Sequence, residues 1–227
     1  MIRLVLFDID GTLVHTGGAG TRAFARAFAS EFAVANGTEK LKFAGRTDVS
    51  LVREFFTNER IEPTPENFAR FFAGYLRWLR EIIADCKGGA CHGVPEFYQS
   101  LRALPEPPLV GLLTGNIQQG ARIKLEHFSL WQWFPFGAFA DDHEDRDQIA
   151  AAALRRGSQQ FGRELRGEEV LVIGDTPLDI RCGRAIGAKV LAVATGGPSL
   201  EELNRHNPDW AVPDLTHVSA TEILGRD

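Results

Sequence analysis

The fold of this 227-residue chain is constrained most by a series of short apolar runs that are separated by helical patterns. The runs are rich in β-branched residues and stop at Gly, Asp or Thr, as buried strands do. The predicted strands are Ile2–Phe7, Leu109–Thr114, Gly137–Ala140, Val170–Gly174, Val190–Ala194 and Trp210–Val212. The predicted helices are Glu96–Leu104, Gln118–His127, Gln148–Phe161 and Leu178–Ile186. Because polarity hardly alternates along the runs, the pattern predicts an α/β fold with a parallel sheet covered by helices on both faces.

A long segment separates the first two predicted strands, and it is far longer than one crossover helix requires. Most of it has helical periodicity: Phe24, Phe28 and Phe32 recur at every fourth position, and a wide apolar face spans residues 68–83. Glycines punctuate both of its ends, which is typical of flexible linkers. We therefore predict a small α-helical insert, residues 15–88, in a core domain formed by residues 1–14 and 89–227.

Composition narrows the class of protein. Charged residues make up 24% of the chain and apolar residues 44%, which are ordinary globular values, and the net charge of −5 provides no basic footprint for nucleic acid. No apolar stretch reaches the ~20 residues that span a bilayer, and acidic residues interrupt the apolar start too early for a signal peptide. The chain has only three cysteines, and a small, odd number of cysteines does not suit a disulfide framework. We expect a cytoplasmic protein with neither nucleic-acid nor membrane partners.

The strongest chemical signal is the pair Asp8 and Asp10, which directly follows the first predicted strand. Two like charges at the end of a buried strand repel each other and are costly to desolvate, and a divalent cation removes that conflict. Strand alternation places Asp8 and Asp10 on the same side, with Ile9 facing away. Gly11 lets the chain turn without a side chain over the site. These residues predict a cation-dependent site.

Two further predicted strands end in polar groups. Asp175 ends one of them, and Asp179 follows in the first turn of a helix that Pro177 opens. Taken alone, Asp179 has an alternative interpretation, electrostatic stabilisation of the helix N-terminus. Two Asp-ended strands in one chain favour a hard-metal site of oxygen ligands. Thr114, Gly115 and Asn116 end another strand and lead into a helix. A hydroxyl and free backbone N–H groups at such a point are typical of a phosphate pocket.

These ordered motifs, from Asp8-Ile9-Asp10-Gly11-Thr12 through Leu113-Thr114-Gly115-Asn116 to Gly174-Asp175 with Asp179, resemble those of the haloacid dehalogenase-like hydrolase superfamily. The helical insert resembles the small cap of that family, and the phosphoglycolate-phosphatase-like branch is the nearest match. The resemblance covers residues 2 to about 195. It implies a doubly wound, Rossmann-like sheet whose first strand is central, with the motifs meeting at the topological switch point.

The resemblance also implies a mechanism. Asp8 would be the nucleophile that forms an aspartyl phosphate, and Asp10 would be the general acid and base. Mg²⁺ would be held by the Asp8 carboxylate, the Asp10 carbonyl and Asp175, with Asp179 in a supporting position. The phosphoryl oxygens would be bound by the hydroxyl of the residue that ends the second strand and by the N–H groups after it, that is, by Thr114, Gly115 and Asn116.

One motif departs from the family pattern, which has a lysine before the last acidic strand. The corresponding segment, residues 140–147, contains no lysine, and Arg146 is the candidate for this position as a catalytic and phosphate-binding cation. Lys124 is the competitor. It lies ten residues past Thr114, and a helix that rises ~1.5 Å per residue would carry it ~15 Å from the pocket, so we expect Arg146 to serve.

The predicted activity is that of a Mg²⁺-dependent phosphatase for a small phosphorylated metabolite. In the family, dehalogenases lack an acid at the position of Asp10, so its presence favours phosphate chemistry. A phosphomutase or a phosphonate hydrolase of the same superfamily remains open. Arg46 and Thr47, in a turn of the insert, are the candidates for substrate selection. The sequence provides no indication of the oligomeric state.

A second class, a phosphoacceptor signalling module, also uses an aspartate-rich pocket and Mg²⁺. Such a module needs neither an acid two residues beyond the phosphorylated aspartate nor a helical insert of this length. A catalytically silent relative that binds a partner through the insert is a third reading, and the intact acidic motifs argue against it.

Overall fold

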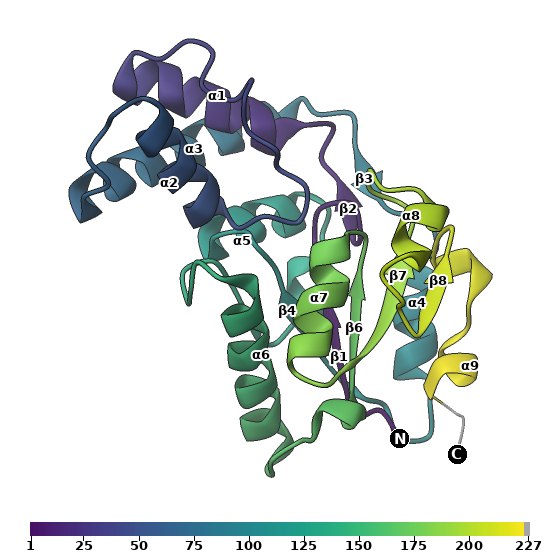
Figure 1. Ribbon diagram of the computed structural model, residues 1–227. Coiled ribbons are helices and arrows are strands. Elements are labelled where there is room, and N and C mark those ends of the chain that lie inside the picture. Colours follow the sequence, from purple (N-terminus) through teal and green to yellow (C-terminus); the bar gives the residue numbers. More distant parts are fainter. Residues whose placement is uncertain (225–227) are drawn as a thin grey trace.

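The computed structural model describes residues 1–224 and has a six-stranded parallel sheet in the order β5-β4-β1-β6-β7-β8 (Figure 1). The central strand β1 pairs in register with β4 on one side and β6 on the other. The strands of the sheet are β1 (Leu4–Phe7), β4 (Leu109–Leu113), β5 (Gly137–Ala138), β6 (Val170–Gly174), β7 (Lys189–Val193) and β8 (Trp210–Val212). This arrangement confirms the predicted α/β, doubly wound parallel sheet with the first strand at its centre.

Helices cover both faces of the sheet, and alternate residues of β1 belong to different hydrophobic clusters. Val5 and Phe7 pack in the cluster that includes residues of α4 (Val94–Arg102), α5 (Gln118–His127) and α9 (Ala220–Leu224). Leu4 and Leu6 pack in the cluster on the opposite face, which is covered by α6 (Arg146–Phe161), α7 (Pro177–Ala185) and α8 (Leu200–Asn204). Because successive strand residues point to opposite faces, a strand buried on both sides must be apolar throughout.

Most predicted elements occur within two residues of the expected bounds, and the differences have local causes. Helix α6 begins at Arg146 rather than at residue 148, because the Asp145 side chain accepts a hydrogen bond from the Asp147 N–H at 2.9 Å and caps the helix there. Helix α7 begins at Pro177, where a missing N–H costs nothing.

A short antiparallel pair, β2 (Val14–His15) with β3 (Gly89–Ala90), was not expected from the sequence. It joins the two segments through which the chain leaves and re-enters the part of the protein built on the six-stranded sheet, which we call the sheet domain. Two residues per strand leave no room for a detectable alternation of polarity, which explains why the sequence did not reveal it.

Between β2 and β3 the chain forms three helices, α1 (Ala19–Phe32), α2 (Asp48–Asn58) and α3 (Pro65–Ala84), which we call the helical lobe. The lobe lies beyond the carboxyl ends of β1 and β4 (Figure 1). Its interior is aromatic: Phe28 stacks on Phe55 with ring centroids 3.5 Å apart and lies 4.5 Å from the ring of Phe71. The phenylalanine repeat therefore forms a hydrophobic core of its own.

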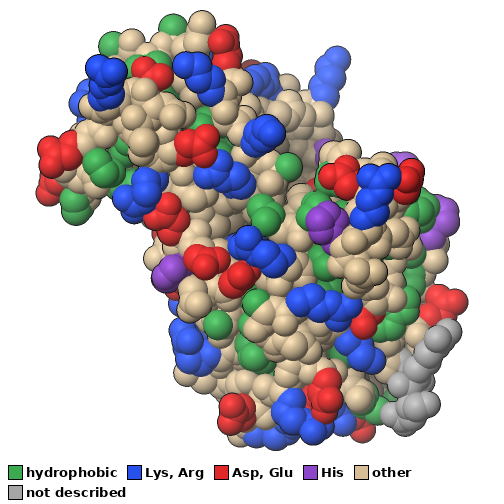
Figure 2. Space-filling view, viewed as in Figure 1, with side chains coloured by type: hydrophobic (Ala, Val, Ile, Leu, Met, Phe, Trp, Pro, Cys, Tyr) green, Lys and Arg blue, Asp and Glu red, His purple; other side chains and the backbone are tan. Residues whose placement is uncertain are grey.

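The surface is mixed in charge. Figure 2 shows acidic and basic side chains interspersed over the lobe and the sheet domain on the visible face. Among residues 1–224, no helix is both long enough and apolar enough to cross a bilayer.

We expect Phe28→Ala to destabilise the helical lobe. Phe28 is fully buried between Phe55 and Phe71, so truncation leaves a cavity as well as losing apolar burial. The expected loss in the free energy of unfolding is about 3–5 kcal/mol, measured by urea denaturation. A loss below about 1 kcal/mol would show that the aromatic core refills the space.

Candidate active site

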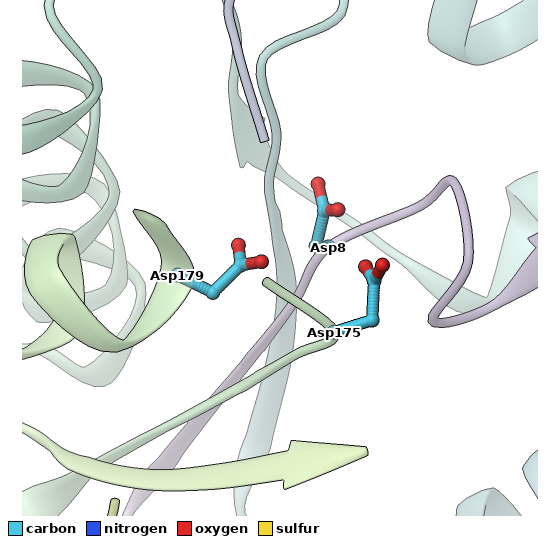
Figure 3. A group of neighbouring side chains, drawn as sticks. All are labelled: Asp8, Asp175 and Asp179. Carbon is cyan, nitrogen blue, oxygen red and sulfur yellow. The ribbon is translucent and has the colours of Figure 1, made fainter. Parts of the chain in front are cut away.

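Three buried carboxylates converge at the carboxyl end of the sheet. Asp8 follows β1, Asp175 follows the neighbouring strand β6, and Asp179 lies in the first turn of α7. One oxygen atom of each lies within 4.8 Å of the other two, and Figure 3 shows the side chains pointing into a common space. The parallel register, which pairs Phe7 with Ile173, brings the two strand ends side by side.

This concentration of negative charge is unfavourable without a partner. Burial raises the pKa of Asp8; nearby Arg146 acts in the opposite direction, and Asp179 and Asp10 raise it further. Burial raises the pKa of Asp175 well above its ordinary value, and Asp179 and Asp8 add to the effect. A purely oxygen-donor set of carboxylates is suited to a hard divalent cation such as Mg²⁺, so the residues present fit the metal that the sequence predicted.

The turn after β1 is shaped around Asp175. Gly11 has φ +81°, and a Cβ atom there would lie 2.6 Å from Asp175 Oδ2, so a side chain fits neither the backbone nor the space. The Thr12 hydroxyl donates a hydrogen bond to Asp175 Oδ1 at 3.0 Å. Gly11 was predicted to leave the site open, whereas the contact of Thr12 was not predicted, although Thr12 is part of the same motif.

Arg146 reaches the acidic cluster, as the sequence analysis expected. Its Nη2 lies 3.0 Å from Asp8 Oδ1 and also donates to Asp179, and Nη1 donates to the Gly45 carbonyl at 2.9 Å. The side chain is almost fully buried. One arginine thus contacts two of the three carboxylates and the loop that precedes α2.

The expectation that Lys124 lies far from the pocket was wrong. Its Nζ lies 2.6 Å from Asp10 Oδ2, and the residue is 4% exposed. The ~15 Å estimate assumed a helix that rises straight away from the strand end. Instead α5 runs beneath the helical lobe, across the direction of the strands (Figure 1). The long side chain of Lys124 therefore reaches Asp10.

The sequence did contain a signal for Lys124. The buried residues of α5 are Gly120, Ala121, Lys124 and Leu125, which form one stripe at helical spacing. A lysine within the buried stripe of a helix requires a partner, because an unpaired buried ammonium group is very costly.

The residues after β4 lie beside Asp10. The Asn116 Nδ2 donates to Asp10 Oδ2 at 2.8 Å and to the Thr114 hydroxyl at 2.9 Å, and Thr114 is fully buried. A Cβ atom on Gly115 would lie 2.4 Å from the Arg46 carbonyl oxygen, so only glycine lets the lobe approach this closely. The predicted phosphate-binding residues after β4 therefore lie beside Asp10 and line the same cavity as Asp8 and Asp175.

The two predicted substrate-selecting residues have local partners. Arg46 forms an ion pair with Glu54. The Thr47 hydroxyl accepts from the Ser50 N–H, which caps α2, and donates to the Glu144 carbonyl at 2.8 Å. Their part in substrate selection stays a prediction.

Asp48, which the sequence analysis did not assign to the site, joins the helical lobe to the sheet domain. Its N–H donates to the Gly115 carbonyl at 2.7 Å, and its Oδ2 accepts from the Ile117 N–H at 2.8 Å. Such an acidic residue in the first turn of a helix also has a purely local interpretation, which explains why the sequence did not reveal this contact.

A cavity of about 360 Å³ lies between the lobe and the sheet domain. The residues that line one side of it include three aspartates and their neighbours: Asp8, Asp10, Asp175, Thr114, Lys124 and Arg146. The opposite side includes apolar and aromatic residues of the lobe: Phe24, Phe43, Leu51 and Tyr75. The site therefore has a charged floor and a partly apolar cover.

Comparison with known proteins agrees with this geometry. The family model described as haloacid dehalogenase-like hydrolase matches residues 5–193, and the chain belongs to that family. Curated relatives include a phosphoglycolate phosphatase of Photorhabdus laumondii, 25% identical over 230 residues that cover 97% of this chain and 92% of the relative. Another is the pyrophosphatase PpaX of Halalkalibacterium halodurans, 24% identical over 221 residues that cover 96% of each chain.

Solved structures share the fold. A HAD hydrolase from Entamoeba histolytica superposes with a TM-score of 0.76 at 17% identity and covers 99% of this chain and 98% of its own. CbbY from Rhodobacter sphaeroides in complex with phosphate superposes with a TM-score of 0.72 at 16% identity, with 95% of each chain covered.

We expect Asp48 to make stability depend on pH. Burial raises its pKa from 3.8 to about 7, and nearby Lys124 opposes the shift. The folded protein therefore holds this proton more tightly than the unfolded chain, so the stabilisation is fully present below pH 3.8 and is lost as pH rises through about 7.

The measurement is urea denaturation of wild type and Asp48→Asn at about pH 4 and about pH 8. The asparagine cannot titrate, so the wild type should lose more free energy of unfolding than the variant, by on the order of 3 kcal/mol. Equal losses in both proteins would show that Asp48 is ionised in the folded state throughout.

Proposed function

We propose that this protein is a Mg²⁺-dependent phosphatase that hydrolyses a small phosphorylated metabolite through an aspartyl phosphate on Asp8. The observation that carries the proposal is the convergence of Asp8, Asp175 and Asp179 at the carboxyl end of the sheet, with Asp10 facing the same cavity. The family match and the relatives named as phosphatases support the same conclusion.

The Mg²⁺ ion would be held by the carboxylates of Asp8 and Asp175 and the carbonyl of Asp10, with Asp179 supporting the site. When bound, it supplies positive charge to the phosphoryl oxygens and offsets the repulsion between the carboxylates. Arg146 already contacts Asp8 and adds a second, permanent positive charge. Phosphoryl transfer needs mainly such positioning and charge neutralisation.

In the first step, the Asp8 carboxylate attacks phosphorus and the bond to the leaving oxygen breaks. Asp10 donates a proton to that oxygen, and the product is an alcohol. In the second step, Asp10 takes a proton from a water molecule that attacks the aspartyl phosphate, which releases inorganic phosphate and regenerates Asp8. Thr114 and the N–H groups of Gly115 and Asn116 would bind the phosphoryl oxygens.

Asp10 also favours an enzyme over a phosphoacceptor signalling module. Its side chain is 42% exposed and lines the cavity, so it can reach both a leaving group and water. A signalling module depends on a long-lived phosphoaspartate, and an acid that activates water beside it would shorten that lifetime.

Asp8→Asn should lower kcat for p-nitrophenyl phosphate by about a thousandfold or more in the presence of Mg²⁺, because the amide is a poor nucleophile. Chelation of the metal with EDTA should abolish wild-type turnover as well. Asp85→Asn, which removes an exposed carboxylate that ends α3, is the matched control and should retain full activity.

Metal-dependent activity of more than a few per cent in Asp8→Asn would exclude Asp8 as the nucleophile. An unchanged circular dichroism spectrum and unfolding curve are required alongside, so that loss of activity reports chemistry rather than loss of fold.

The cover of the cavity also bears on the substrate class. Its aromatic and aliphatic side chains suit an organic group, and the cations Arg46 and Lys87 line the cavity beside them. We therefore expect kcat/KM to be higher for small phosphomonoesters than for inorganic pyrophosphate, measured as phosphate release from a panel of both. A preference for pyrophosphate, or conversion of a sugar phosphate into an isomer without phosphate release, would contradict this assignment.

A further inference from the structure

Lys124 is a buried cation that the proposed mechanism does not use. It projects from α5 into the boundary between the helical lobe and the sheet domain, and its side chain is 5% exposed. The first turn of α1 passes directly over it, because a Cβ atom on Gly20 would lie 3.3 Å from Lys124 Nζ. An ammonium group in such a place is desolvated and requires close partners.

Lys124, Asp10 and Asn116 form a closed triangle of hydrogen bonds. Lys124 Nζ donates to Asp10 Oδ2 and to Asn116 Oδ1, each at 2.6 Å, and Asn116 Nδ2 donates to the same Asp10 Oδ2 at 2.8 Å. Each of the three side chains therefore contacts the other two.

The triangle dictates the orientation of the Asn116 amide. An ammonium group only donates hydrogen bonds, so it must face the amide oxygen, and the amide NH₂ group is then directed at Asp10. With an apolar side chain in place of Lys124, the Asn116 amide could rotate and present its oxygen to the Asp10 carboxylate instead.

The consequence for Asp10 is an asymmetry between its two oxygens. Oδ2 accepts two hydrogen bonds, whereas within residues 1–224 Oδ1 has no hydrogen-bond partner. A carboxylate held by one oxygen has a defined plane, and the other oxygen is the one free to exchange a proton with a reacting group.

We propose that Lys124 is a positioning residue for proton transfer: with Asn116 it holds Asp10 by Oδ2 and leaves Oδ1 for the leaving group and the attacking water. This inference rests on the proposed function, in which Asp10 is the general acid and base. Lys124 acts through Asp10 and does not itself contact the reacting atoms.

The test is the dependence of kcat/KM on the acidity of the leaving group. A nitrophenolate leaves without a proton, whereas a more basic phenolate needs one, so a defect in general acid catalysis grows as the leaving group becomes more basic. The probes are 2,4-dinitrophenyl, p-nitrophenyl and phenyl phosphate, assayed with Mg²⁺ against wild type, Lys124→Met, Asp10→Asn and Arg122→Met.

We expect Lys124→Met to lower kcat/KM for phenyl phosphate about a hundredfold and for 2,4-dinitrophenyl phosphate less than tenfold. Asp10→Asn should show the same trend more steeply. Arg122→Met removes an exposed cation from the same helix, where it pairs with Glu126, and should behave as wild type. Lys124→Gln, which remains polar but has no charge, carries the same test if Lys124→Met does not fold.

Two outcomes of this kinetic assay would overturn the inference, and they are distinguishable. An equal loss for all three esters in Lys124→Met, beside a steep dependence in Asp10→Asn, would leave Asp10 as the acid and show that Lys124 is only structural. A flat profile in Asp10→Asn itself would refute the general acid role and, with it, both the proposed function and the inference.

A crystal structure of Lys124→Met tests the inference without an activity assay. We expect the Asp10 carboxylate to turn away from the orientation seen here, or to occupy more than one orientation. An unchanged Asp10 carboxylate, still accepting from Asn116 through Oδ2 alone, would contradict a positioning role for Lys124.

Discussion

The whole site depends on the electrostatics of carboxylates buried at one end of a parallel sheet. Asp8, Asp175 and Asp179 approach one another where water is largely excluded, and burial raises the pKa values of Asp8 and Asp175. Such a cluster is tolerable only beside positive charge. Arg146 supplies part of it, and the proposed Mg²⁺ would supply the rest. The arrangement therefore suits a bound cation.

Two buried cations of the site contact different aspartates. Arg146 lies against Asp8 and Asp179, whereas Lys124 lies against Asp10. The division separates two chemical tasks in the proposed mechanism. A permanent charge beside Asp8 suits neutralisation of the transferring phosphoryl group, and a hydrogen-bonding charge beside Asp10 suits control of its geometry.

The helical lobe is tied to the sheet domain by backbone contacts close to the chemistry. Asp48 bonds to the peptide groups of Gly115 and Ile117, and Arg146 bonds to the Gly45 carbonyl. A substrate held against the lobe would thus meet the same loop that is proposed to bind phosphate. In the proposed function, this short path would link contacts with the substrate to the phosphate-binding residues.

Much of this protein could be predicted from its sequence because the relevant signals are local. The buried strands, the acidic pairs after them and the helical insert each follow from periodicity or from the cost of burying charge. The same reasoning made Asp8, Asp10, Asp175 and Asp179 candidate site residues. The pairing of Val14–His15 with Gly89–Ala90 escaped prediction, because two-residue strands carry no periodicity.

The sequence by itself determined the strands, the helices and the acidic motifs and their order along the chain, since each of these elements depends on residue type and spacing. Only the tertiary structure decided which cation meets which aspartate. Counting residues along α5 placed Lys124 far from the site, yet the direction of that helix beneath the lobe returns its ammonium group to Asp10. The direction of a helix is set by the packing of its buried face against the rest of the fold, and spacing along the chain does not encode it.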